Sequence, residues 1–163
     1  MFIHENEFIH ILVNTRCGHT SMYEYFGIEP YSRIPDIFNW ISSKKRRILV
    51  LRNPIDRINS AYKNSLQFIG TGVDPDKAFV SHSTPYLKLI SDLEFEIIDF
   101  AKIDEYIPMS NKTVVTYSNN TDFQYIPNKK YTEMDVREEY ELYKTIMNTK
   151  LEISVSEWKA LTP

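Results

Sequence analysis

Two short segments of the chain carry side chains that could bind an anion. The first runs over residues 14–21 and includes Arg16, Gly18, Thr20 and Ser21. A guanidinium offers a fork of donors that suits phosphate or sulfate, and a glycine lets the backbone approach such a group closely. The two hydroxyl groups add further donors. These residue types favour the binding of a phosphate or sulfate group.

The second segment is Arg52-Asn53-Pro54, with Ser60 further along the chain. Ser60 falls on the same side of a helix as Arg57 by the i, i+3 rule, so its hydroxyl and Arg52 could meet one phosphate together. Each segment alone also has a plainer interpretation. The first could be a capped strand-to-helix turn, and Arg52 could pair with Asp56.

Apolar runs that predict buried strands precede both segments. Residues 8–13 and 48–51 are nearly continuous apolar runs, as in strands covered on both faces of a parallel sheet. A segment of helical character follows over 20–26 and ends at Gly27, and apolar residues at helical spacing follow over 54–68. The repeated order of strand, polar turn and helix predicts an α/β fold around a small, mainly parallel sheet flanked by helices. Ligands bind beyond the carboxyl ends of strands in such sheets, where both segments lie.

The remaining elements continue this pattern. We expect short helices over 36–43, 76–81 and 85–92, a stronger helix over 95–107, a third strand over 113–117, and a helix from a capping box at 132–135 to about 148. The chain has 163 residues and no internal repeat, which predicts a single domain over residues 1–163.

The composition argues against several classes of protein. Hydrophobic residues make up 42% and charged residues 25%, as in a globular protein with a core. The formal net charge of −3 provides no overall attraction for nucleic acid, so an anion site has to be built locally. The run over 8–13 is too short for a signal-peptide core or a membrane span. We therefore expect a cytoplasmic protein with no nucleic-acid partner and no membrane span, and the sequence leaves its oligomeric state open.

The cysteine and histidine residues do not form a recognisable metal or redox motif. Cys17 is the only cysteine, so the chain cannot form an internal disulfide, which fits a reducing compartment. A thiol beside Arg16 could act as a nucleophile, but we interpret Cys17 as a small residue that fills the loop. His4 and His10 do not have the spacing of zinc ligands, and we expect no metal.

Together, the two segments resemble the PAPS-dependent sulfotransferases, especially the carbohydrate type (PAPS is 3′-phosphoadenosine 5′-phosphosulfate). The family signature R-(N/D)-P-x-x-R-x-x-S-x-Y is matched at every defined position by residues 52–62. The resemblance implies that Arg52 and Ser60 bind the 3′-phosphate of PAPS. It also implies a P-loop-NTPase-like sulfotransferase fold.

The first segment is similar to the other family motif, a strand followed by a loop such as P-K-x-G-(S/T)-(S/T)-(S/L). Arg16 stands where many members have lysine, although some carbohydrate sulfotransferases have arginine, and His19 replaces a small hydroxyl residue. Residues 113–123, with Lys129 and Lys130, bear a weaker resemblance to later parts of the family. The resemblance implies that the 5′-phosphosulfate is bound by Arg16, Cys17, Gly18, His19, Thr20 and Ser21.

The resemblance further implies that a sulfuryl group moves from PAPS to a hydroxyl of a small molecule or glycan. Arg16 would stabilise the charge that develops on the bridging oxygen, and no metal is required. The acceptor hydroxyl needs a general base, and no histidine occurs over residues 22–47 between the motifs. His82, in a predicted polar turn, is the candidate base, with His19 as the alternative. An exposed loop histidine is an equal interpretation of His82.

Two other functions remain open at this point. One is a noncatalytic module that binds PAPS or another nucleotide, because so short a chain could lack an acceptor site. The other is a P-loop kinase, which is disfavoured because the Walker A pattern G-x-x-x-x-G-K-(S/T) is absent.

Overall fold

The computed structural model describes residues 1–29, 36–108 and 133–162. The predicted strand over 113–117, the rest of the segment 113–123, and Lys129 and Lys130 lie outside the described residues. The chain divides into two compact units, which we describe separately. One comprises Met1–Leu51, Asp92–Val114 and Thr149–Pro163, and the other Arg52–Ser91 and Val115–Asn148.

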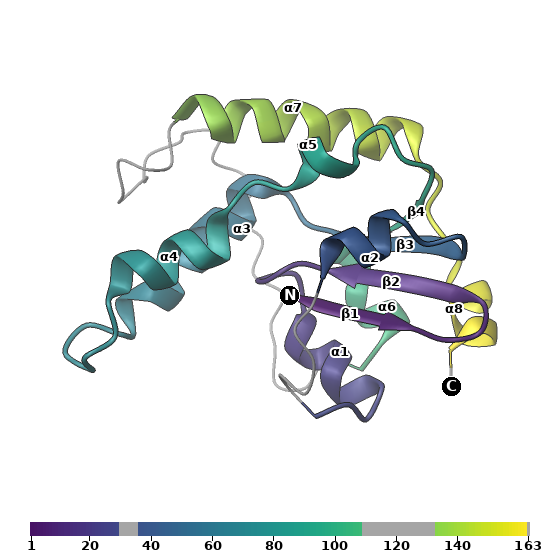
Figure 1. Cartoon of the computed structure of the whole chain (residues 1–163), viewed down its shortest axis with the longest axis horizontal. Coiled ribbons are helices and arrows are strands. Elements are labelled where there is room, and N and C mark those ends of the chain that lie inside the picture. Colours follow the sequence, from purple (N-terminus) through teal and green to yellow (C-terminus); the bar gives the residue numbers. More distant parts are fainter. Residues whose placement is uncertain (30–35, 109–132, 163) are drawn as a thin grey trace. The chain divides into compact units, whose positions relative to one another are not determined.

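A four-stranded sheet forms the centre of the first unit, in the spatial order β1-β2-β3-β4 (Figure 1). The strands are β1 (Phe2–Glu5), β2 (Ile9–Val13), β3 (Arg46–Leu51) and β4 (Glu96–Asp99). β1 pairs with β2 antiparallel, whereas the β2–β3 and β3–β4 pairs are parallel. The predicted α/β class is confirmed, and the sheet is mixed.

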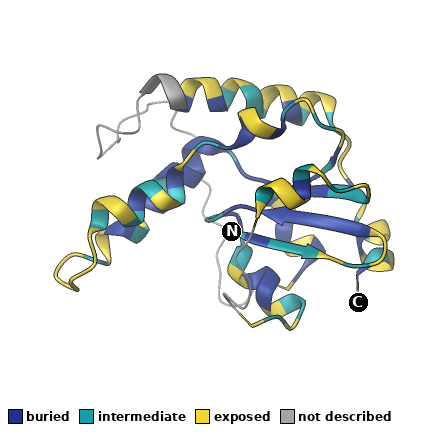
Figure 2. Cartoon of the chain, viewed as in Figure 1, coloured by how far each residue is buried: buried dark blue, intermediate teal, exposed yellow. Residues whose placement is uncertain are grey.

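The two strands predicted from apolar runs, β2 and β3, have the most buried residues of the sheet. Every residue of β2 is buried, as Figure 2 shows, and so are the last four residues of β3. β1 was not predicted, because its His4 and Glu5 interrupt the apolar pattern. A turn joins β1 to β2, in which the Asn6 side chain accepts hydrogen bonds from the backbone N–H groups of Phe8 and Ile9.

Helices cover both faces of this sheet. The helices α1 (His19–Tyr25), α6 (Ile103–Tyr106) and α8 (Val155–Leu161) contribute to one hydrophobic core with alternate residues of the strands. The short helix α2 (Ile37–Ile41) lies on the opposite side from α1 (Figure 1). Cys17, in the loop that carries the first predicted segment, is part of this core.

The strong helix predicted over 95–107 is wrong. Glu96–Asp99 is strand β4, followed by a 3₁₀ turn, η1 (Phe100–Lys102), and the short α6. Successive residues Ile97 and Ile98 are both buried, as expected when a strand is covered on its two faces. Asp99 ends the strand, because its side chain accepts a hydrogen bond from the N–H of Ala101 at 3.0 Å and starts the next turn.

The tail after the last long helix, for which no element was predicted, completes this unit. Leu151 and Ile153 exchange backbone hydrogen bonds with Ile97 at 2.9 and 3.1 Å. Ser154 then caps α8 by accepting from the N–H of Glu157. No helix among the described residues is long and apolar enough to cross a membrane.

The second unit is helical among its described residues. It contains α3 (Pro54–Leu66), α4 (Pro75–Ser83), α5 (Leu87–Ile90) and α7 (Glu133–Thr149). All four match predicted helices in place, within a few residues at the ends. Buried residues of α3, α4 and α7 form one apolar cluster of this unit: Ile55, Ile58, Ala61, Phe79 and Val136.

Candidate functional site

A tight loop links β2 to α1 in the first unit and holds the first predicted segment. Asn14 is buried, and its side-chain Oδ1 accepts a hydrogen bond from the backbone N–H of Thr15 at 2.8 Å. The backbone carbonyl of Asn14 accepts from the backbone N–H of Cys17 at 3.1 Å. Arg16 has φ 64° and Gly18 has φ 84°, so both lie in the left-handed region. That conformation costs a residue other than glycine about 1–3 kcal/mol, and such strain is concentrated at ligand-binding sites.

Gly18 is required at its position for two reasons. Its φ of 84° disfavours any side chain, and an added Cβ would lie 3.3 Å from Cε2 of Phe100. Its carbonyl accepts from the N–H of Met22 at 3.1 Å, so it is the residue from which α1 begins. The glycine therefore lets the loop lie directly against η1.

The side chains of this loop differ in their exposure. Cys17 is fully buried in the core of the first unit, as its interpretation as a loop-filling residue requires. Ser21 is also fully buried, and its Oγ has no hydrogen-bond partner within the described part of the chain. Arg16 and His19 are partly exposed and Thr20 is exposed. Arg16, His19 and Thr20 are thus the side chains of this loop that a ligand can reach from solvent, whereas Cys17 can offer only its backbone.

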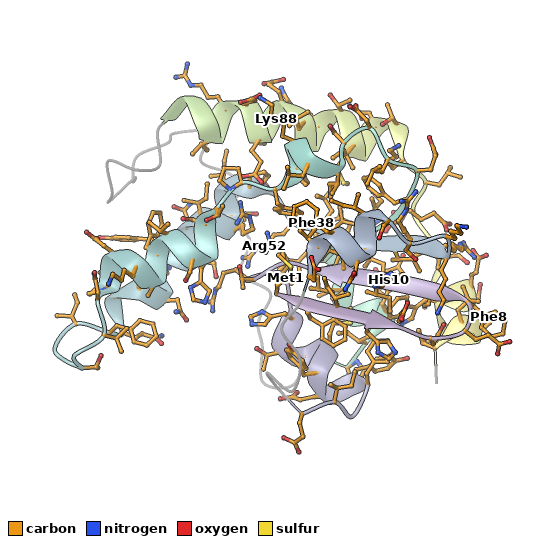
Figure 3. All side chains as sticks on the ribbon, in the orientation of Figure 1. Met1, Phe8, His10, Phe38, Arg52 and Lys88 are labelled. Atoms are coloured by element: carbon orange, nitrogen blue, oxygen red, sulfur yellow. The ribbon has the colours of Figure 1, made fainter. Side chains whose placement is uncertain are left out.

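The second predicted segment begins the second unit. Arg52, labelled in Figure 3, is the first residue after β3 and is 8% exposed. The Asn53 side chain caps α3 by accepting from the N–H of Ile55 at 2.9 Å, and Pro54 occupies the first helical position. Ser60 lies two turns further along α3 and is 9% exposed. The local structure predicted for this segment is therefore present.

Arg57 has a structural role that the sequence did not reveal. Its guanidinium is 1% exposed and donates to Oε2 of Glu139 at 2.8 Å and to the carbonyls of His82 and Ser83 at 3.1 Å. Oε1 of Glu139 accepts from the N–H of Tyr86 at 3.2 Å. The second arginine of the signature thus ties α3 to α7 and to the end of α4. The sequence drew attention to Arg57 only through its place in the signature. Its partner Glu139 lies 82 residues further along the chain, so no local pattern could reveal the ion pair.

His82 lies in the last turn of α4, and the prediction of a polar turn was wrong there. Its Nδ1 is 2.6 Å from the carbonyl oxygen of Ala78. Since a carbonyl can only accept, Nδ1 carries the proton, and Nε2 is the nitrogen that can take one up. The backbone of His82 is held by Arg57 on α3. The candidate base is thereby linked to the helix that carries Ser60.

The predicted site residues fall in different units. Residues 16–21 belong to the first unit, and Arg52, Ser60 and His82 to the second. Each segment nevertheless begins directly after one of two neighbouring strands of the sheet. In the parallel pairing of β2 with β3, Val13 is opposite Val50, so the two strands end at the same edge. Asn14 and Arg52 follow the ends of these neighbouring strands.

No group of three or more histidine, cysteine or acidic side chains among the described residues could hold a metal ion. Comparison with known proteins adds no assignment, since no family model, no curated protein and no solved structure matches this chain.

Proposed function

We propose that the protein is a sulfotransferase that moves a sulfuryl group from PAPS to a hydroxyl, on a carbohydrate or other small molecule. The observation that carries the proposal is the parallel pairing of β2 and β3. Each strand leads directly into one of the two segments that resemble the family motifs. Open α/β sheets bind ligands at this edge.

In this proposal the donor is bound at its two charged ends. Arg52 and the hydroxyl of Ser60 bind the 3′-phosphate; Arg52 directly precedes the cap of α3, and Ser60 lies two turns into that helix. The loop over residues 16–21 binds the 5′-phosphosulfate through its backbone N–H groups and through the side chains of Arg16 and Thr20, whereas the side chain of Ser21 is buried. The strained φ of Arg16 supports a loop built for a ligand. The proposed fold is that of the P-loop-NTPase-like sulfotransferases.

The chemical step assigns one role to each of two side chains. The acceptor oxygen forms a bond to sulfur as the bond between sulfur and the 5′-phosphate oxygen breaks. Nε2 of His82 takes the hydroxyl proton, and Arg16 stabilises the charge on the departing oxygen. The products are a sulfate ester and 3′,5′-ADP. The Nδ1–H tautomer of His82 supports its part in this scheme.

A noncatalytic PAPS-binding module is the second candidate, and the absence of a histidine over residues 22–47, between the two motifs, favours it. It would use Arg52, Ser60 and the loop over residues 16–21 in the same way but would lack turnover. A P-loop kinase is less well supported, because its Walker A lysine has no counterpart before Thr20.

A transfer assay separates these candidates. We expect the wild-type chain to transfer labelled sulfate from PAPS to at least one member of a panel of glycans and small alcohols. His82→Ala should slow transfer by about 100-fold or more while 3′,5′-ADP binds as before. His4→Ala, which removes a histidine from β1, is the matched control and should retain turnover. Transfer at the wild-type rate by His82→Ala would remove His82 from the mechanism, and donor binding without any transfer would favour the noncatalytic module.

A further inference from the structure

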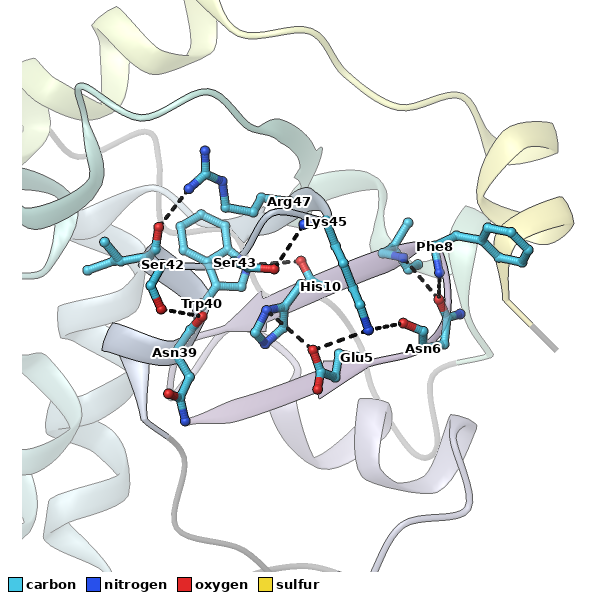
Figure 4. A network of polar contacts seen from close by, with 12 residues as sticks. Glu5, Asn6, Phe8, His10, Asn39, Trp40, Ser42, Ser43, Lys45 and Arg47 are labelled. Atoms are coloured by element: carbon cyan, nitrogen blue, oxygen red, sulfur yellow. Dashed lines mark hydrogen bonds and ion pairs between the residues drawn. The ribbon is translucent and has the colours of Figure 1, made fainter.

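A buried histidine lies at the point where α2 is attached to the sheet (Figure 4). His10 is on β2, and its side chain is 5% exposed. Its backbone carbonyl accepts a 2.9 Å hydrogen bond from the indole Nε1 of Trp40, the fully buried residue of α2. The attachment of α2 therefore depends on the local packing around His10.

The charged neighbours of His10 come from both adjacent strands. Glu5 on β1 and Arg47 on β3 are its partners in register. Oε2 of Glu5 lies 3.9 Å from Nδ1 of His10 and 3.4 Å from Nζ of Lys45. Nδ1 itself has no hydrogen-bond partner among the residues described. The imidazole thus faces one anion and two cations, and α2 has no charged residue of its own.

Arg47 connects this cluster to the other end of α2. Its Nη1 donates to the carbonyl of Ile41, the last residue of α2, at 2.7 Å. Its guanidinium carbon lies 5.9 Å from the centre of the Trp40 ring system. Because Arg47 is opposite His10 in the sheet, a positive charge on the imidazole would repel the group that holds α2.

We propose that His10 is an acid-sensitive latch: a proton on its buried imidazole loosens α2 from the sheet, while the opposite face of the sheet stays packed. The geometry supplies both parts of such a device. The imidazole of His10 is buried next to two cations, those of Lys45 and Arg47. The five-residue helix α2 is held by one hydrogen bond to the backbone carbonyl of His10 and by another from Arg47.

The direction of the pH effect follows from the surroundings of His10. Burial lowers the pKa of His10; Glu5 opposes this shift, and Lys45 and Arg47 add to it. A histidine whose folded-state pKa is lowered contributes stability that is present above its unfolded pKa of about 6.5 and is lost as the pH falls toward the folded value. The attachment of α2 should therefore weaken below about pH 6.5.

Hydrogen exchange at the two tryptophan indoles tests this latch within one molecule. Trp40 reports on α2, and Trp158 is buried in the core on the other face of the same unit. As the pH falls from about 6.5, we expect the opening constant of the Trp40 indole to rise by up to about tenfold per pH unit, after correction for intrinsic exchange. Trp158 should change much less. Equal changes at the two indoles would overturn the local latch.

Substitutions and a direct titration complete the test. His10→Gln should abolish the pH dependence at Trp40, whereas His4→Gln, on the neighbouring strand, should retain it. In an NMR titration of the wild type, His10 should have a pKa below that of a free histidine. Glu5→Gln should lower the pKa of His10 further and Lys45→Met should raise it. A wild-type His10 that titrates at or above about 6.5 would overturn the proposal even if His10→Gln does not fold.

Discussion

Arg52 is the residue that gives the proposed donor site its selectivity. It follows β3 directly and is 8% exposed, so a phosphate bound there would be partly shielded from water. We predict that Arg52→Ala weakens binding of 3′,5′-ADP by roughly 10- to 100-fold, the effect of a lost charged hydrogen bond, and leaves 5′-AMP binding nearly unchanged. Calorimetry with both nucleotides measures this. The exposed Lys63→Ala on α3 is the control, and equal losses for the two nucleotides would contradict the 3′-phosphate assignment.

Tyr106 on α6 should make the first unit sensitive to alkali. Its hydroxyl donates to the carbonyl of Ile153 at 2.6 Å, and Oε1 of Glu152 lies 3.3 Å from the same hydroxyl oxygen. Burial together with the negative charge of Glu152 raises the pKa of Tyr106 to about 12. A raised pKa of this kind gives stability that is present below the unfolded value of about 10 and is lost as the pH rises toward 12.

The loss at Tyr106 corresponds to about 2–3 kcal/mol in the free energy of unfolding. In urea denaturation at a series of pH values, Tyr106→Phe should lack this loss, although it is less stable at neutral pH because it cannot donate to Ile153. Tyr140→Phe on α7 should behave as the wild type does. An unchanged alkaline dependence in Tyr106→Phe would show that another group titrates.

At the scale of secondary structure, α7 is held to α3 by a buried ion pair. Glu139 and Arg57 are 2% and 1% exposed, and their side chains meet at 2.8 Å. Glu139→Ala would leave the guanidinium buried without its counter-charge, so we predict a loss of about 3–5 kcal/mol in the free energy of unfolding. Glu138→Ala is the matched control, since the neighbouring Glu138 pairs with Lys88 at the surface. Similar losses for both variants in chemical denaturation would contradict this role.

The elements that the sequence predicted are those with an uninterrupted local pattern. β2 and α3 were found because an apolar run and a capped helical stripe need no distant partner to be recognised. β4 was mistaken for a helix, because Ile97 and Ile98 fit a buried strand and a buried helix equally well. Only its pairing with β3 decides between the two, and that pairing is not local.

In the candidate site, too, the sequence predicted only the features that depend on local pattern. The positions of Arg52 and Ser60 could be predicted from a strand followed by a capped helix. The left-handed φ of Arg16 could not, because it depends on the turn that Asn14 closes. The partners of Arg57 are equally out of reach, since they come from α4 and α7.

At the scale of the whole chain, the proposed binding of a nucleotide relies on local charge. The net charge is −3, so the molecule as a whole does not attract a nucleotide. The positive charges proposed to bind the donor, Arg16 and Arg52, are therefore local ones.

Calorimetric titration of the wild-type chain with 3′,5′-ADP, with ATP–Mg as the comparison, measures whether the chain binds a nucleotide of the PAPS type. This product of sulfuryl transfer carries both the 3′-phosphate and the 5′-phosphate that the two segments are proposed to bind. We predict saturable binding of 3′,5′-ADP and none of ATP–Mg. Absence of 3′,5′-ADP binding, even with the ligand at millimolar concentration, would contradict both the sulfotransferase and the noncatalytic PAPS-binding module.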